Sequence, residues 1–212
     1  MPEWCLRFGI VPLANQQPFS RQDAAEYTEQ ILALGVASGI DRIGVAPAAT
    51  MQRARETLHA RKSLGLHDTM QFTYRNPDRS TNPQVSVPNA QAMIVGACSY
   101  ATDAPPAPLQ LSARVARYAW ANYYESLREG LGVVSDALRA DGWNAQVFVD
   151  HNALVDRESA YLAGLGWYGK NANLLINGAG SFFVLGSVVT DAPLVVNERP
   201  ADDGCGACKR CL

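Results

Sequence analysis

Residues 147–175, VFVDHNALVDRESAYLAGLGWYGKNANLL, are the part of the sequence that most strongly constrains the fold. The stretch starts within an apolar run that predicts a strand over 145–150, and it ends in a second apolar run at 173–176. A short helix is predicted between them over 156–163, followed by a turn rich in glycine. These alternating elements indicate a mixed α/β protein in which helices cover a central sheet, giving three layers.

The flanking sequence supplies the remaining elements. Ser20 and Asp23 have the spacing of a capping box and predict the start of a helix that ends at Gly39. Thr50 predicts the cap of a second helix, which reaches about Leu64. Apolar runs predict strands over 41–46, 90–100 and 181–189, helical spacing predicts a helix over 123–140, and the proline-rich residues 67–88 predict a long loop.

Composition limits the class of protein. A chain of 212 residues with 48% hydrophobic and 18% charged residues is typical of one substantial globular core. The net charge of −2 gives no overall case for nucleic-acid binding, although a local basic patch stays open. No apolar run is long enough to span a membrane, no secretory signal is present, and five cysteines do not form a disulfide framework. We therefore expect a cytoplasmic protein without membrane contact.

Asp150 is the first candidate for chemistry. It ends a hydrophobic strand, where a carboxylate packs poorly but can line a cleft. Spacing alone favours a simpler role, in which the side chain caps the next turn.

Two further segments are candidates for ligand binding. Residues 164–171, GLGWYGKN, contain three glycines through which a backbone can approach a ligand closely, with Trp167 as a flat wall and Lys170 as a charge. Residues 117–124, RYAWANYY, crowd aromatic side chains ahead of a helix. A tight turn with an exposed lysine and ordinary core packing remain the alternatives.

The C-terminal residues 205–212, CGACKRCL, have cysteine-ligand spacing. Cys205, Cys208 and Cys211 read C-x2-C-x2-C, which is typical of the start of a ferredoxin-type iron–sulfur motif. Three thiolates leave the ligand set incomplete. A structural zinc site is the weaker alternative, because it also needs a fourth ligand.

Three of these blocks, in this order, resemble the epoxyqueuosine reductase family: residues 117–131, the stretch VDHNALVDRESAYLAGLGWYGKN, and GSFFVLGSVVTDAPL followed by CGACKRCL. The resemblance implies a nitroreductase-like α/β/α domain that binds cobalamin, followed by the start of a ferredoxin-like double-cluster segment. The implied divisions are an irregular N-terminal extension over 1–19, the cobalamin-binding domain over 20–191, and a linker with the first part of a cluster motif over 192–212.

The resemblance also implies an activity and a site. Family members reduce the epoxide of epoxyqueuosine in tRNA to queuosine, with electrons arriving from iron–sulfur clusters. By position, Asp150 would be the proton donor, and Cys205, Cys208 and Cys211 would bind part of a [4Fe-4S] cluster. The implied cobalamin contacts are Arg79, Tyr118, Trp120, Asn122, Tyr123, Asp150, Trp167, Gly169, Lys170, Asn171 and Ser181.

The implied partners are tRNA and an electron donor such as flavodoxin or ferredoxin, and we expect a monomer. Because the cluster motif stops after three cysteines, we expect the 212-residue chain alone to be inactive. Asn122 and Tyr124 depart from the family, which usually has aspartate and histidine there. These departures keep open a cobalamin-binding or cobalamin-handling module without epoxide reduction. A reductive dehalogenase relative is disfavoured because no export signal is present.

Overall fold

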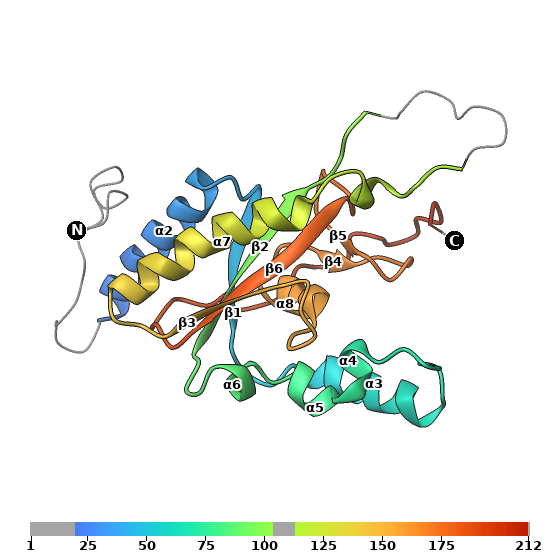
Figure 1. Cartoon of the computed structure of the whole chain (residues 1–212), viewed down its shortest axis with the longest axis horizontal. Coiled ribbons are helices and arrows are strands. Elements are labelled where there is room, and N and C mark those ends of the chain that lie inside the picture. The colour runs from blue at the N-terminus through green and yellow to red at the C-terminus, as the bar shows by residue number, and fades with distance from the viewer. Residues whose placement is uncertain (1–19, 104–112, 212) are drawn as a thin grey trace.

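The computed structural model describes residues 20–103 and 113–211 of the chain. Its centre is a four-stranded sheet in the order β1-β2-β6-β3, in which every neighbouring pair is antiparallel (Figure 1). The strands are β1 (Arg42–Pro47), β2 (Ala92–Ser99), β3 (Ala145–Val149) and β6 (Phe183–Thr190). The predicted extension over 1–19, with Cys5 in it, lies outside the described residues.

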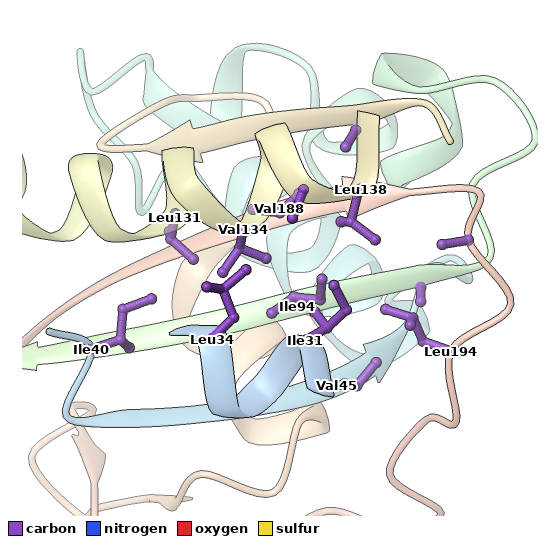
Figure 2. Packing of buried hydrophobic residues seen from close by; sticks show 14 of the residues in the cluster. Ile31, Leu34, Ile40, Val45, Ile94, Leu131, Val134, Leu138, Val188 and Leu194 are labelled. Carbon is purple, nitrogen blue, oxygen red and sulfur yellow. The ribbon is translucent and has the colours of Figure 1, made fainter. Parts of the chain in front are cut away.

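One face of the sheet is covered by two long helices, α2 (Arg21–Ala37) and α7 (Tyr123–Ala140) (Figure 1). Leu127, Leu131, Val134 and Leu138 of α7 recur at helical spacing and are fully buried. Figure 2 shows several of them meeting side chains from α2 and from the strands. This is the main hydrophobic core, and the predicted helix over 123–140 is confirmed.

The opposite face is covered by α8 (Asp156–Leu162) and by the segment that leads into it. Its core contains Met93, Val95, Phe148 and Leu154. Gly44 of β1 lets the sheet approach this layer closely, since a Cβ there would lie 2.7 Å from the Ala163 carbonyl oxygen. Helices therefore lie on both faces of the sheet, and the predicted α/β class is confirmed.

The starts of α2 and of the next helix test the two capping signals that the sequence predicts. At α2, the Ser20 side chain accepts from the Asp23 N–H, and the Asp23 carboxylate accepts from the Ser20 N–H, as the capping box predicts. The expectation for Thr50 is wrong, because α3 (Gln52–Ser63) begins after Met51 and has no side-chain cap.

The segment predicted as a long loop instead contains three one-turn helices, α4 (Phe72–Arg75), α5 (Pro77–Ser80) and α6 (Pro83–Ser86). Asn76 and Asn82 cap α5 and α6 by accepting backbone N–H bonds, and a proline occupies the first position of each. The Asn-Pro pairs that suggested turns are thus helix starts.

Two smaller elements complete the fold near the C-terminus. Strands β4 (Trp167–Tyr168) and β5 (Leu174–Leu175) form a hairpin, and a single 3-10 turn, η1 (Arg117–Ala119), precedes α7. The segment after β6 packs on the domain through buried Ala192 and Leu194. Within the described part of the chain, no helix is long and apolar enough to cross a membrane.

Candidate functional site

Three strand ends meet at one edge of the sheet. Strands β2 and β3 both run antiparallel to β6, so their carboxyl ends lie beside its amino end. Ser99 pairs with Phe183 there, and the residues that leave the sheet next are Tyr100 and Asp150. The topology therefore gathers polar and aromatic side chains from distant parts of the sequence.

A cavity of about 800 Å³ lies at this edge. It is walled by the strand ends, by the start of α8, by the β4–β5 hairpin and by residues of α4 and η1. Its lining joins apolar surface from residues such as Leu154 and Leu185 to hydroxyl, carboxyl and guanidinium groups. The polar lining residues include Tyr118, Tyr124, Asp150, Asn152, Asp156, Arg157 and Ser181. A large cavity of mixed lining is typical of a small-molecule or cofactor site.

Asp150 lines this pocket and has an unusual backbone conformation. Its φ angle is +52°, in the left-handed region, and the residue is exposed. The conformation costs about 1–2 kcal/mol for most residues, although aspartate adopts it more readily than most. Such strain, placed at the mouth of a large pocket, is typical of a functional position. Among the described residues, no hydrogen bond of the Asp150 side chain supports the simpler role, in which it caps the next turn.

Aromatic side chains form the rim of the pocket. The Tyr100 ring lies 5.4 Å from that of Phe182, 5.9 Å from that of Tyr123 and 6.5 Å from that of Tyr118, measured between centroids. Tyr118 lines the pocket with 52% of its surface exposed. These rings offer flat apolar surface to a ligand.

Asp156, which was not among the predicted site residues, also lines the pocket. Its Oδ1 atom is buried and has no hydrogen-bond partner among the described residues. Burial, reinforced by the charge of Asp150 and opposed by Arg157, raises the pKa of Asp156 to about 8. A carboxyl group with this pKa is mostly protonated at neutral pH. The Asp156-Arg157 pair was visible in the sequence, but its burial was not.

Glu158, two residues further along α8, is buried in a different way. Its carboxylate accepts from the Arg53 guanidinium at 3.2 and 2.5 Å and from the Tyr168 hydroxyl at 3.0 Å. Arg53 also lies 4.3 and 4.5 Å from the ring centroids of Tyr161 and Tyr168. This cluster joins α3, α8 and β4 behind the pocket wall.

The glycine-rich loop contributes Tyr168 to the pocket lining, and its Trp167 and Lys170 contact the cysteine segment. The Trp167 indole N–H lies 3.3 Å from Cys205 Sγ, and Lys170 Nζ donates to the carbonyl oxygens of Gly206 and Cys208, both at 2.8 Å. Gly204 packs on the indole so closely that a Cβ there would lie 2.6 Å from the ring. The loop thus fixes the position of the cysteines relative to the domain.

The other predicted contacts are divided between the pocket and its surroundings. Tyr118, Asp150 and Ser181 lie in the pocket lining. Asn122 caps α7 by accepting from the Glu125 N–H, and Trp120 donates to the Val115 carbonyl. Tyr123 packs on Tyr100, Arg79 is exposed on α5, and Gly169 and Asn171 shape the β4–β5 turn. Their cobalamin contacts stay predictions.

The three cysteines lie close together in sequence but are not arranged as a metal site. Cys205 is half-buried, Cys208 and Cys211 are exposed, and a turn joins the Cys208 N–H to the Cys205 carbonyl at 2.8 Å. Among residues 20–103 and 113–211, no group of three or more histidine, cysteine or acidic side chains is placed to hold a metal ion. The predicted iron–sulfur ligation by these cysteines therefore stays a prediction.

The fold and the site define a mixed α/β domain with a large pocket, which is lined by aromatic side chains and two carboxyl groups. Residues 80–151, which end just after Asp150, match the family model "Epoxyqueuosine reductase QueG, DUF1730". An epoxyqueuosine reductase from Xanthomonas campestris is 31% identical over 203 residues, which cover 91% of this chain and 56% of the relative.

Solved structures give the same result. A crystal structure of selenomethionine-labelled epoxyqueuosine reductase matches with a TM-score of 0.79 and 27% identity, covering 88% of this chain and 51% of the other. A structure of epoxyqueuosine reductase with a tRNA-Tyr epoxyqueuosine-modified stem loop matches at 0.77 and 27%, covering 86% and 50%. The predicted resemblance is confirmed: this chain is homologous to epoxyqueuosine reductases.

A more distant likeness extends to a B12-dependent reductive dehalogenase, with a TM-score of 0.58 and 17% identity over 93% of this chain and 24% of the other. At that identity the two share the fold alone. The chain spans about half the length of the curated relatives it matches.

Proposed function

We propose that this chain is the cofactor-binding part of a cobalamin-dependent oxidoreductase that reduces the epoxide of epoxyqueuosine in tRNA to queuosine. The observation that carries the proposal is Asp150, an acid on left-handed backbone at the mouth of a large pocket. Homology to epoxyqueuosine reductases supplies the reaction class.

The pocket residues fit a corrinoid. The cavity of about 800 Å³ has the size and open shape that a large planar group requires. Tyr100, which packs on Phe182, and Tyr118 would offer apolar contact to the edge of such a ring, and Ser181 and Asn152 of the lining would bind its amide side chains. When bound, cobalamin would supply low-valent cobalt as the reductant for the epoxide.

Asp150 is proposed as the acid of this reaction. An epoxide oxygen leaves its carbon more easily when it receives a proton as the bond breaks, and a positioned acid typically accelerates such a step by about 10²–10⁴-fold. Asp150 is exposed to the pocket, and the residues around it include two more polar groups, His151 and Asn152. Asp150 follows the last residue of β3 on this strained backbone and lines the pocket.

Electron delivery is proposed to begin at the cysteine segment. Trp167 and Lys170 hold this segment against the hairpin whose Tyr168 and Leu174 line the pocket. We propose that the three cysteines bind part of a [4Fe-4S] cluster, which a flavodoxin or ferredoxin would reduce. We propose the cytoplasm as the site of this reaction, since its substrate would be a tRNA.

The test uses the full-length product of the reading frame that encodes this chain, supplied with cobalamin and a strong reductant. An RNA stem loop carrying epoxyqueuosine should be converted to the queuosine form, which mass spectrometry separates from it by the loss of one oxygen. Asp150→Asn should reduce turnover by about 10²-fold or more. Asparagine also adopts left-handed backbone readily, so this variant removes the acid without disturbing the fold. Normal turnover by the variant would remove Asp150 from the mechanism.

A cobalamin-handling module without epoxide reduction is the second candidate. It is favoured by Asn122, whose side chain caps α7 instead of facing the pocket, and by Tyr124, which lines the pocket where the family usually has histidine. Cobalamin binding without conversion of the stem loop would support this candidate.

A further inference from the structure

We propose that Phe72 is a further ligand-contact residue of the pocket and that Arg53 is the positioning residue that holds it there. Both residues belong to the arm, which consists of helices α3, α4 and α5 (residues 52–80). In Figure 1 the arm stands apart from the sheet and from the two long helices α2 and α7. The inference deepens the proposed corrinoid site and rests on it.

Phe72 combines three properties at the pocket. Its side chain belongs to the pocket lining, together with that of its neighbour Thr73. It leaves 65% of its surface exposed, so it packs on little of the protein itself. Its φ angle is +20°, which crowds a bulky side chain against its own backbone and costs free energy. A ligand that covers the ring gives a physical reason for keeping it exposed and strained in the lining of a cavity.

The apolar residues that precede Phe72 lack this combination. Leu66 and Met70 are 59% and 56% exposed, but both lie outside the pocket lining that the structure describes. Neither has a positive φ angle. Exposure alone therefore does not distinguish Phe72 from its neighbours, whereas its place in the pocket and its backbone conformation do.

The position of Phe72 depends on the rest of the arm. Lys62 of α3 donates to the Arg75 carbonyl at the end of α4, at 3.3 Å. The Ser80 hydroxyl of α5 donates to the Thr73 carbonyl of α4, at 3.1 Å. These bonds tie α4 to both of its neighbours, so α4 and Phe72 follow the position of α3.

Arg53, near the start of α3, joins the arm to the pocket wall. Its guanidinium donates to the buried Glu158 carboxylate of α8 at 3.2 and 2.5 Å, and it lies 4.3 and 4.5 Å from the ring centroids of Tyr161 and Tyr168. Tyr168 lines the pocket, and its hydroxyl donates to the same carboxylate at 3.0 Å. A planar cation that is both hydrogen-bonded and stacked has few alternative positions.

This arrangement gives Arg53 a role in ligand binding without contact with the ligand. Arg53 holds α3 against α8, the arm carries Phe72 to the pocket, and the Phe72 ring adds apolar contact to the bound corrinoid. A contact that is already in place costs less to form than one that is ordered on binding. Loss of Arg53 should therefore weaken binding only while Phe72 is present.

The first test is titration of the 212-residue chain with hydroxocobalamin, followed by the visible spectrum, with circular dichroism to confirm the fold of each variant. Phe72→Ala should weaken binding by about tenfold, and Phe72→Tyr, which keeps the ring, should restore it. Met70→Ala removes an exposed apolar side chain from the same segment and should have no effect. Unchanged binding by Phe72→Ala, or an equal loss in Met70→Ala, would overturn the proposal.

The second test is a double-mutant cycle on the same titration. Arg53→Gln should weaken binding by about threefold or more in the natural chain and should add nothing to the loss in Phe72→Ala. Arg61→Gln, at an exposed position on the same helix, is the control and should leave binding unchanged. Additive losses would mean that Arg53 acts through Tyr168 instead of the arm, and they would overturn its positioning role.

The natural chain separates failure of this inference from failure of the proposed function. Saturable binding of hydroxocobalamin by the natural chain and equally by Phe72→Ala would reject the role of Phe72 and leave the corrinoid pocket standing. No saturable binding by the natural chain would reject the corrinoid pocket and, with it, this inference.

Discussion

The two faces of the sheet are built for different purposes. Under α2 and α7, the side chains are apolar, buried and in mutual contact, as Figure 2 shows. Over the opposite face, the layer around α8 is interrupted by an open pocket, and within a single helical turn it buries Glu158 and the Oδ1 atom of Asp156. The first face therefore contributes mainly to stability. The second face includes polar groups around the pocket, whose burial lowers stability.

The two carboxyl groups of α8 sharpen this contrast. Glu158 is compensated by Arg53 and by the Tyr168 hydroxyl, as a structural charge should be. Asp156 has no such partner among the described residues and faces the pocket. The two carboxyl groups of α8 therefore differ in compensation, and only the one without a partner among the described residues lines the cavity.

The largest effect is expected from a matched pair of leucines. Leu131→Ala removes a fully buried side chain under α7 and should lower the free energy of unfolding by about 3–5 kcal/mol. Leu185→Ala, at the half-buried pocket wall, should cost about 1–2 kcal/mol, because the pocket already exposes part of the side chain. Urea unfolding of both variants measures the difference, and equal losses would show that the two faces are packed alike.

The next effect concerns pH. Because the pKa of Asp156 is raised to about 8, the folded state holds its proton between about pH 4 and 8 while the unfolded state has lost it. Stability should therefore fall as pH rises through this range. Asp156→Asn, which stays neutral, should gain about 2–4 kcal/mol over the natural chain between pH 5 and 9. The exposed Asp136→Asn is the control and should show no such gain; parallel curves for all three proteins would contradict the burial of Asp156.

A smaller effect is expected behind the pocket wall. Glu158→Gln keeps a hydrogen-bond acceptor but removes the charge that compensates Arg53, and it should cost about 1–2 kcal/mol, since Arg53 is half-exposed. Glu56→Gln on α3, whose carboxylate accepts from Gln52 at the surface, is the matched control and should leave the unfolding curve unchanged. If the free energy of unfolding falls no more than in the control, the Arg53–Glu158 pair contributes no more than an ordinary surface ion pair.

Local signals predicted much of this molecule. The Ser20–Asp23 capping box, the apolar stripe of α7 and the strand ahead of Asp150 all depend on residues close in sequence, and all three are confirmed. The one-turn helices of 72–86 were missed because an Asn-Pro pair is compatible with both a turn and a helix start.

The features that sequence reasoning missed depend on distant partners. Sequence reasoning did not predict that Trp167 and Lys170 contact the cysteine segment, 36–38 residues along the chain, and their cobalamin contacts stay predictions. Asp156 was noted only as part of a motif, because its burial arises where α8 meets the strand ends. Neither relation is encoded in spacing or periodicity.

The central claim is that this pocket binds a corrinoid. The direct measurement is titration of the purified 212-residue chain with hydroxocobalamin, followed by the visible spectrum and by equilibrium dialysis. Ser181→Trp fills the pocket lining, and Val36→Trp adds the same side chain to an exposed position on α2. Saturable binding to one site is predicted, weakened about tenfold or more by Ser181→Trp and unchanged by Val36→Trp. No saturable binding, or equal binding by both variants, would contradict the account.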